Sequence, residues 1–314
     1  MEKIRIGHLS TFYHTAMVLM ARDDANRRLD SQVEWRLFGT GPAVVSAFDR
    51  GELDLAYIGL PPAIIGMEHG VRIVCIAGGH MEGTVISSKK CYRGAPEITE
   101  LREILRQFAG LRIGVPGKGS IHDVIIRECL GRSGLERDIE VANFAWSDQV
   151  LEALLKDEVA AAVGTPALAV AVCRYAEGAI LYPPSLLWPN NPSYGILAAR
   201  DFLAKKKEIA KKFLILHEEA ASYLRSSPAE AARLIAGYVG FIDEEFVLDT
   251  LKVSPKYCAQ ISEDYINSTM EFVAVLKRLG YISRRLSESE IFDLSLINQI
   301  HPEKDHYGEG LRLG

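Results

Sequence analysis

The sequence lacks the features that carry several common protein functions. Its 314 residues contain no apolar run of the roughly 18–20 residues that a membrane-spanning helix needs, so no membrane span is expected. Acidic residues (41) outnumber Lys and Arg (36), and no basic face or run of cations stands out. This pattern excludes a typical nucleic-acid binder. The Lys-rich stretch 204–212 has helical periodicity and is typical of a solvated helix face.

Cysteine is also scarce and scattered. The five cysteines include no CxxC pair, so the usual zinc and redox motifs are absent, and we predict no metal and no cofactor. Most of the five are expected to be small buried hydrophobic side chains. The first ten residues, "MEKIRIGHLS", enter a strand almost at once, so no signal peptide is expected within them. The expected location is therefore the cytoplasm if the sequence is complete, and the periplasm or the cell exterior if a leader has been removed.

Catalytic and nucleotide motifs are missing too. There is no GxSxG and no HExxH, and we predict no catalytic residue. The stretch "LRIGVPGKGSIHD" (111–123) has the order strand, Gly-rich turn, helix that often holds phosphate. However, Lys118 is followed by Gly119, which breaks the P-loop pattern, and the glycines follow GxxGxG spacing instead of GxGxxG. The stretch therefore matches neither the P-loop nor the dinucleotide-binding motif.

What the sequence does contain is an alternation of short apolar strands with helical patterns. Examples are "IRIGHLS", "VEWRLFG", "LDLAYIG" and "VRIVCIAGG" in the first part, and "LRIGVPG", "IEVANFAW", "VAAAVGT" and "AILYPP" in the second. This alternation predicts α/β units and mostly parallel sheets. Long amphipathic helices follow after about Arg200, with Ser227-Pro228 as a helix start and Gly280 as a helix stop. The tail 301–314 has no apolar periodicity and is expected to be peripheral.

The strand pattern occurs twice. Residues 4–7 (IRIG) open the first half and 111–114 (LRIG) open the second, and segment 43–59 is echoed by 149–164. Both echoes are offset by about 107 residues, and each includes a buried strand that ends in glycine. The sequence therefore predicts two lobes that are built in the same way.

Small and hydroxyl residues gather where the predicted strands end and helices begin. Ligands bind beyond the carboxyl ends of parallel strands, and helix N-termini offer free N–H groups to electron-rich ligand atoms. We therefore expect these turns to form a ligand cleft. The turns are 10–14 (STFYH), 39–42 (GTGP), 59–62 (GLPP), 78–80 (GGH), 117–120 (GKGS), 146–148 (WSD) and 164–166 (GTP).

Four stretches resemble a known family. They are "IRIGHLSTFYHTAMVLMA", "GTGPAVVSAFDRGELDLAYIGLPPAIIG", "LRIGVPGKGSIHDVIIRECLGRSGL" and "LKRLGYISRRLSESEIFDLSLI". The chain resembles, over roughly residues 3–300, the periplasmic-binding-protein type II superfamily. Within it, the likeness is to the nitrate, sulfonate, taurine and thiamine-precursor (NMT1/THI5-like) solute-binding proteins of ABC transporters.

The resemblance implies a two-lobed α/β clamp that closes by hinge motion. Lobe one would be residues 1–87 plus 197–314, and lobe two the inserted residues 88–196. A small-molecule ligand would lie between them, and an ABC permease and ATPase would be the partners of a monomeric binding protein. The turns and the resemblance together give these candidate ligand-binding residues: Ser10, Thr11, Phe12, Tyr13, His14, Thr40, Gly41, Gly59, Pro61, His80, Ser120, Trp146, Thr165 and Tyr194.

Two questions stay open in the sequence. The same fold includes cytoplasmic biosynthetic enzymes of the thiamine-pyrimidine and menaquinone-route types, so an enzyme is the alternative function. The ligand is also undefined. Lys118 is the only cation in the predicted turns, so a bidentate Arg clamp for sulfonate or carboxylate is not evident. A pyrimidine-type or other small polar molecule suits the aromatic and His residues at least as well as an oxyanion.

Overall fold

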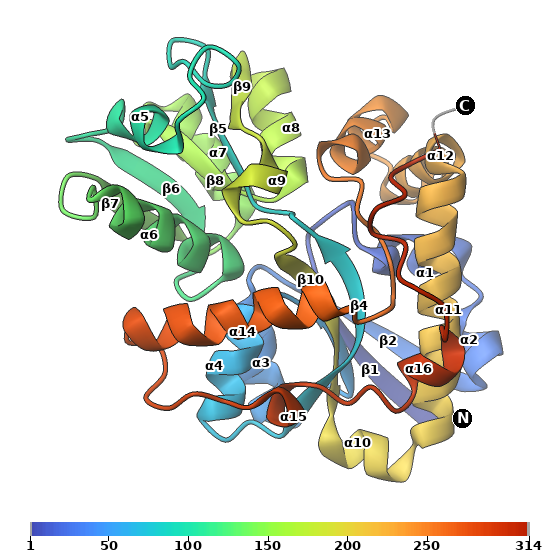
Figure 1. Cartoon of the computed structure of the whole chain (residues 1–314). Helices are drawn as coiled ribbons and strands as arrows, with labels where there is room; N and C mark the ends of the chain where they lie inside the picture. The colour runs from blue at the N-terminus through green and yellow to red at the C-terminus, as the bar shows by residue number, and fades with distance from the viewer. Residues whose placement is uncertain (1, 313–314) are drawn as a thin grey trace.

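The computed structural model describes residues 2–312 and contains two five-stranded sheets. The first sheet has the order β2-β1-β3-β10-β4 and the second β7-β6-β8-β5-β9. In Figure 1 the second sheet and its helices form the upper left of the molecule, and the first sheet lies below and to the right. The strands are β1 (Glu2–Leu9), β2 (Ser31–Phe38), β3 (Leu55–Ile58), β4 (Ile73–Met81), β5 (Val85–Lys89), β6 (Arg112–Pro116), β7 (Glu140–Phe144), β8 (Ala161–Gly164), β9 (Gly178–Tyr182) and β10 (Pro192–Ala199).

Each sheet is mostly parallel with one antiparallel strand. In the first sheet β1 pairs in parallel with β2 and β3, and β10 runs antiparallel to both β3 and β4. In the second sheet β6 pairs in parallel with β7 and β8, and β5 runs antiparallel to both β8 and β9. The predicted two-lobed α/β fold with mostly parallel sheets is therefore confirmed.

The two sheets also share their register. Ile6 and Gly7 of β1 pair with Leu55 and Ala56, and Ile113 and Gly114 of β6 pair with Ala161 and Ala162. Neither Gly7 nor Gly114 has room for a side chain. A Cβ added at Gly7 would lie 2.8 Å from Leu53, and one added at Gly114 would lie 2.9 Å from Val150. The echo at an offset of about 107 residues thus reflects two equivalent packing positions.

The chain passes between the sheets twice, at residues 82–84 and 183–191. The lobe boundaries expected from the sequence, 87/88 and 196/197, fall inside β5 and β10, a few residues beyond these crossings. We use "first lobe" and "second lobe" for the two sheets with the helices packed on them. The division at those boundaries stays a prediction.

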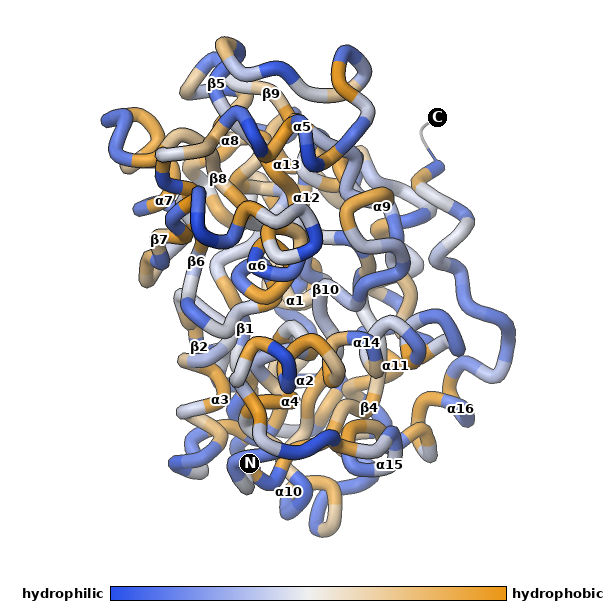
Figure 2. The backbone as a smooth tube through the Cα atoms, turned by 60° about the vertical axis from the view of Figure 1, so that its left-hand side comes forward, coloured by the Kyte–Doolittle hydropathy of each residue, from blue (hydrophilic) through white to orange (hydrophobic). Residues whose placement is uncertain are grey.

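Sixteen helices surround the sheets within the described residues, and none is long and apolar enough to cross a membrane. Figure 2 shows that the outer loops are predominantly hydrophilic, as expected for chain that faces water. The helices are α1 (Thr15–Arg22), α2 (Ala25–Leu29), α3 (Gly41–Asp49), α4 (Leu60–Glu68), α5 (Leu101–Arg106), α6 (Ile121–Ser133), α7 (Ser147–Leu155), α8 (Pro166–Tyr175), α9 (Pro184–Leu187), α10 (Arg200–Lys205), α11 (Lys207–Ser226), α12 (Pro228–Val239), α13 (Glu244–Val253), α14 (Glu263–Arg278), α15 (Glu288–Ile291) and α16 (Ile297–Ile300).

The helix boundaries follow local rules. Helix α12 begins with Pro228 after Ser227, because proline lacks only an N–H that the first turn leaves free. Gly280, with a φ of +76°, ends the segment after α14. Both boundaries confirm the sequence prediction.

Contacts on two sides of the molecule join the lobes. On one side, Phe246 of α13 packs against Ala167, Val170 and Ala171 of α8, and Arg174 pairs with Asp243 and Glu245. On the other side, the hydroxyl of Tyr281 donates to Asp123 of α6, and Arg278 pairs with Glu128. The second lobe is thus fixed against the C-terminal helices at both ends of the interface.

The C-terminal tail is packed more closely than the sequence suggested. Tyr307 is 4% exposed, and its hydroxyl donates to the carbonyl oxygens of Cys258 (2.8 Å) and Gln260 (2.9 Å). His301 is 2% exposed. The other described residues of the tail are exposed or half-buried, so most of it is peripheral as expected, and His301 and Tyr307 are single anchoring side chains that leave no apolar period. Residues 313–314 lie outside the described residues.

Candidate functional site

A small cavity lies between the two sheets. The space open to the centre of a water molecule inside it is about 40 Å³, several times what one water needs, so it suits a small ligand. Its lining comes from both lobes: Leu9, Ser10, Thr11, Tyr13, His14, Gly39, Thr40, Gly41, Gly59, Pro62 and Ser193 from the first, and Pro116, Ser120, Ile121, His122, Ser147 and Thr165 from the second.

The cavity forms where strands end and helices begin. β1, β3, β6 and β8 all run toward it, and α1, α4, α6 and α8 all start next to it. The first N–H groups of a helix have no partner inside the helix, and the helix dipole adds a partial positive charge there. Helices α3 and α7 also begin at lining residues, Gly41 and Ser147, so six helix starts direct donors toward one small space without any cationic side chain.

Two of the lining hydroxyls already have structural roles. The Ser120 Oγ donates to the carbonyl oxygen of Pro116 (2.6 Å) and accepts from the N–H of Asp123 (3.3 Å), which caps α6. The Thr165 Oγ1 accepts from the N–H of Leu168 (3.2 Å) and caps α8. Ligand contacts at these residues would add to hydrogen bonds that are already made.

Other lining groups are unpaired. Within residues 2–312, the Oγ1 of Thr11 and the Nδ1 of His14 are buried and have no hydrogen-bond partner. Leaving a buried polar atom unpaired costs about 1–3 kcal/mol. Because both residues line the cavity, they are the lining groups best placed to gain a ligand hydrogen bond.

The cavity is electrically neutral. No Asp, Glu, Lys or Arg lines it in the part of the chain that the structure describes. Burial lowers the pKa of His122 to about 4 and holds the pKa of His14 well below its usual value. Both imidazoles are therefore uncharged near neutral pH. Lys118, the one cation in the predicted turns, lines a separate surface hollow with Gly119 and Tyr281.

Aromatic rings support the floor of the cavity. The ring of His14 lies 4.0 Å from that of Tyr194, and the ring of Tyr13 lies 4.8 Å from that of His80, measured between centroids. His80 is fixed by a 2.6 Å hydrogen bond between its Nε2 and the carbonyl oxygen of Ser254. These contacts hold Tyr13 and His14 in place at the cavity wall.

Most of the candidate residues come together at this cavity. Nine of them line it: Ser10, Thr11, Tyr13, His14, Thr40, Gly41, Gly59, Ser120 and Thr165. That they bind a ligand stays a prediction.

Five candidates do not line the cavity. Phe12 packs on Phe246 at a centroid distance of 5.8 Å, in the apolar contact between lobes. Pro62 lines the cavity in place of its neighbour Pro61. Ser147 lines it in place of Trp146, which is 36% exposed. His80 lies behind Tyr13, and the hydroxyl of Tyr194 accepts from the N–H of Thr15 (3.2 Å). These five side chains support or flank the site.

Eight lining residues were not among the candidates: Leu9, Gly39, Pro62, Pro116, Ile121, His122, Ser147 and Ser193. Gly39, Pro62 and Ser147 belong to the turns that the sequence analysis named, so those turns were the available signal. Ser193 precedes Tyr194 on β10, and strand alternation places only one of two neighbours on a given face.

The fold now defines the class of protein. Two five-stranded sheets with these strand orders, joined by two crossings around an interlobe cavity, form the periplasmic-binding-protein type II fold. The chain belongs to the NMT1-like family, whose profile matches residues 1–240.

Solved structures share this fold at low identity. The alkanesulfonate-binding protein SsuA from Xanthomonas axonopodis pv. citri, bound to MOPS, has a TM-score of 0.77 and 17% identity, covering 93% of this chain and 98% of its own. The periplasmic aliphatic sulphonate binding protein SsuA from Escherichia coli has a TM-score of 0.76 and 18% identity, covering 100% and 96%. The periplasmic nitrate-binding protein NrtA from Synechocystis PCC 6803 has a TM-score of 0.77 and 13% identity, covering 96% and 88%. No curated protein sequence matches the chain.

Proposed function

We propose that this protein is the solute-binding component of an ABC import system and binds one small, polar organic molecule or singly charged oxyanion between its lobes. The observation that carries the proposal is the neutral cavity between the sheets, with helix starts from both lobes directed into it. Membership of the NMT1-like family and the likeness to sulfonate- and nitrate-binding proteins support it.

The cavity chemistry limits the ligand class. Burying a charge without a partner is costly, and the lining offers no cation to a strongly anionic ligand. Helix N-termini and hydroxyls favour a neutral molecule with electron-rich atoms, or one negative charge spread over several oxygens. Tyr13 and His14 line the cavity beside the hydroxyls, and this mixed lining suits a small heteroaromatic ring of the pyrimidine type as well as a sulfonate.

A thermal-shift screen tests the binding proposal. The panel contains pyrimidines, alkanesulfonates, nitrate and aromatic acids. A ligand at 100 times its Kd stabilises the native state by about 2.7 kcal/mol, which raises the unfolding midpoint by several degrees. Calorimetry with the best compound should give one site per chain and no turnover. No stabilisation by any member of the panel would contradict the proposal.

The alternative is a biosynthetic enzyme on the same fold, and the observation that favours it is the pair of histidines at the cavity. Histidine is the commonest general base at neutral pH. However, Nδ1 of His122 pairs with the Thr84 hydroxyl at 2.9 Å, and in residues 2–312 no carboxylate among the cavity-lining residues orients either imidazole. Product formed from a bound pyrimidine or aromatic acid, and lost on His14→Gln while binding persists, would favour the enzyme.

The transport proposal also sets a location and partners. A binding protein delivers its ligand to the permease and ATPase from outside the cytoplasmic membrane. Fractionation of the source cells should therefore recover this chain in the periplasmic or extracellular fraction. Recovery in the cytoplasm alone would favour the enzyme.

A further inference from the structure

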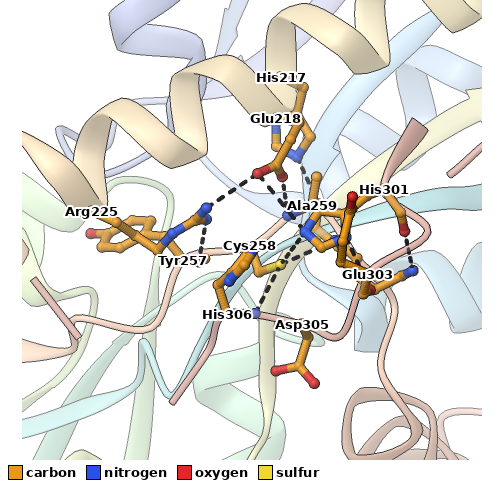
Figure 3. Close-up of polar contacts among 12 residues, drawn as sticks. His217, Glu218, Arg225, Tyr257, Cys258, Ala259, His301, Glu303, Asp305 and His306 are labelled. Carbon is orange, nitrogen blue, oxygen red and sulfur yellow. Dashed lines mark hydrogen bonds and ion pairs between the residues drawn. The ribbon is translucent and has the colours of Figure 1, made fainter. Parts of the chain in front are cut away.

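A second polar cluster lies away from the cavity, where three distant segments meet. Glu218 is on α11, Cys258 lies between α13 and α14, and His301 follows α16. One oxygen, the sulfur and one ring nitrogen of these residues lie within 4.8 Å of one another. Figure 3 shows the three side chains pointing toward one another. We propose that Glu218, Cys258 and His301 bind one divalent transition-metal ion, best matched by zinc, which ties the C-terminal tail to the first lobe.

The spacing of the three donors is close to that of a tetrahedral site. The usual zinc bond lengths to sulfur, nitrogen and oxygen place neighbouring ligand atoms about 3.3–3.6 Å apart. The Sγ of Cys258 lies 3.6 Å from the Nε2 of His301, and that nitrogen lies 3.9 Å from the Oε1 of Glu218. The sulfur–nitrogen distance already matches this range, the nitrogen–oxygen distance exceeds it by a few tenths of an ångström, and all three atoms lie within 4.8 Å of one another, so an ion would draw the Glu218 carboxylate closer to the other two donors.

The surrounding hydrogen bonds orient the donors. The Nδ1 of His301 lies 3.2 Å from the carbonyl oxygen of Glu303, which can accept only if Nδ1 carries the proton. The Nε2 then presents its lone pair to the cluster, the arrangement that metal-bound imidazoles adopt. The Sγ of Cys258 accepts N–H bonds from His306 (3.3 Å) and Gln260 (3.4 Å), which stabilise negative charge on sulfur.

Glu218 is held from its other sides. Its Oε2 accepts from the N–H of Ala259 (3.1 Å), and its Oε1 accepts from the Nη2 of Arg225 (3.2 Å). A carboxylate oxygen has two lone pairs, so Oε1 keeps one for an ion. Arg225 competes for this oxygen and lowers the affinity of the site relative to one without a cation.

The ligand chemistry selects the metal. A thiolate, an imidazole and a carboxylate suit zinc and similar transition metals, whereas Ca²⁺ and Mg²⁺ prefer oxygen alone. The thiolate and the carboxylate together balance the two charges of the ion, which suits a site where Cys258 is fully buried and His301 is 2% exposed. The ring of His306 lies 4.9 Å from that of His301 between centroids, but His306 is not among the residues whose donor atoms gather within 4.8 Å, so we count three protein ligands.

The ion would join elements that already meet behind the first sheet. The N–H of Cys258 donates to the carbonyl oxygen of Gly79 on β4 (3.2 Å), and the N–H of Gly78 donates to the carbonyl oxygen of Ala259 (2.7 Å). Metal bonds to α11 and to the tail would fix this segment from two more sides. The role is structural and does not depend on the proposed transport function.

The alternative is a polar cluster that holds no ion, in which the Cys258 thiol donates to His301. Tag-free full-length protein, stripped with a chelator, is titrated with Zn²⁺ by calorimetry, and bound zinc is measured after gel filtration. One equivalent is expected, together with a higher unfolding midpoint. Co²⁺ in place of zinc should give the near-ultraviolet thiolate-to-cobalt absorption and the visible bands of tetrahedral coordination.

Variants assign the binding to the cluster. Cys258→Ser should abolish the thiolate–cobalt absorption, and His301→Gln should weaken zinc binding at least roughly tenfold. Cys173→Ser, which removes an exposed thiol elsewhere, is the matched control and should bind zinc normally. If Cys258→Ser does not fold, the thiolate–cobalt absorption should persist in the double variant Cys91→Ser, Cys173→Ser, which removes both exposed thiols and leaves Cys258 in place. No stoichiometric zinc, or unchanged binding in both cluster variants, would overturn the proposal.

Discussion

At the scale of single residues, the lining hydroxyls of the cavity include some that already make hydrogen bonds and a buried one that does not. Ser120 and Thr165 cap helices, so replacing them would change stability and affinity together. Thr11 differs, because its Oγ1 is buried at the cavity without a partner in the described chain. A substitution at Thr11 therefore isolates the contribution of one hydroxyl to binding.

Thr11→Val is expected to weaken binding of the best ligand from the screen by roughly 2- to 12-fold, the equivalent of one hydrogen bond of about 0.5–1.5 kcal/mol. Stability should stay the same or rise, since an unpaired buried hydroxyl is removed. Calorimetry and urea unfolding measure the two effects. Thr269→Val is the control, because its hydroxyl bonds to the carbonyl oxygen of Tyr265 within α14, far from the ligand. Equal affinities for wild type and Thr11→Val would show that Thr11 does not contact the ligand.

The buried histidines predict how stability depends on pH. Burial lowers the pKa of His80 to about 3 and those of His122 and His217 to about 4, and His14 shifts in the same direction. The unfolded chain binds these protons near pH 6.5. Below that pH the unfolded state holds more protons, so the stability present at neutral pH is lost as pH falls toward 4.

The free energy of unfolding, measured by urea titration, should therefore fall steadily from pH 7 to pH 4, with a slope of up to about 1.4 kcal/mol per pH unit for each histidine. His122→Asn, which keeps a group able to bond the Thr84 hydroxyl, should reduce the slope. His69→Gln, at an exposed position, should leave it unchanged. A flat stability profile down to pH 4 would contradict the buried neutral state of these side chains.

At the scale of elements, the turn between β6 and α6 is shaped by the opposite lobe. Gly117 has a φ of +58°, and an added Cβ would lie 2.7 Å from the Cγ2 of Thr40. A methyl group there would therefore both strain the turn and push against the first lobe. The matched position is Gly134, which ends α6 with a φ of +68° and has open space around it.

Gly117→Ala and Gly134→Ala should both cost about 1 kcal/mol of stability from left-handed backbone strain. Only Gly117→Ala should also weaken ligand binding, roughly 5- to 150-fold, because crowding of about 1–3 kcal/mol opposes closure of the lobes. Urea unfolding and calorimetry on both variants separate the effects. Equal loss of affinity in both variants would rule out the clash with Thr40 as the cause.

The same elements show which features of the fold and the site could be predicted from the sequence. Strand, turn and helix order followed from apolar periodicity and from Gly and Pro positions, and the repeat identified the equivalent turns of the two lobes. Within a turn, which of two adjacent residues lines the cavity depends on the local backbone direction, and apolar periodicity does not encode that direction. Trp146 and Ser147 illustrate this, as do Tyr194 and Ser193. The cluster of Glu218, Cys258 and His301 spans separations of 40 and 43 residues, so no local motif could reveal it.

At the scale of the whole molecule, a clamp that opens about a hinge, as the resemblance implies, would have to break the contacts between the lobes. Tyr281 reaches from the C-terminal region to Asp123, whose Oδ1 also accepts from Arg127 (2.8 Å) and Asn143 (2.9 Å). Asp123 thus keeps partners of its own if the lobes separate. We therefore expect opening to break the hydrogen bond from the Tyr281 hydroxyl and to leave the other bonds of Asp123 in place.

Tyr281→Phe should shift the ligand-free protein toward an open form and weaken binding roughly tenfold, since the lost hydrogen bond joins a neutral donor to a carboxylate. Small-angle scattering should report a larger radius of gyration without ligand and a normal one at saturation, for a monomer in both cases. Tyr175→Phe, at an exposed position of the second lobe, is the control. Unchanged affinity and scattering would show that this contact does not govern closure.

The antiparallel strand of the first sheet has a consequence for how the chain folds as it is made. β10 lies between β3 and β4, so those two strands have no common neighbour until residue 199 has left the ribosome. Every strand of the second sheet, by contrast, lies within residues 85–182. Because domains fold as units once their residues are available, the inserted lobe can finish before the lobe that contains the N-terminus. In pulse-labelled nascent chains, amides of β6 and β8 should gain protection no later than those of β10, and the growing chain should carry a completed second lobe while the first lobe still lacks β10, the strand that joins β3 to β4.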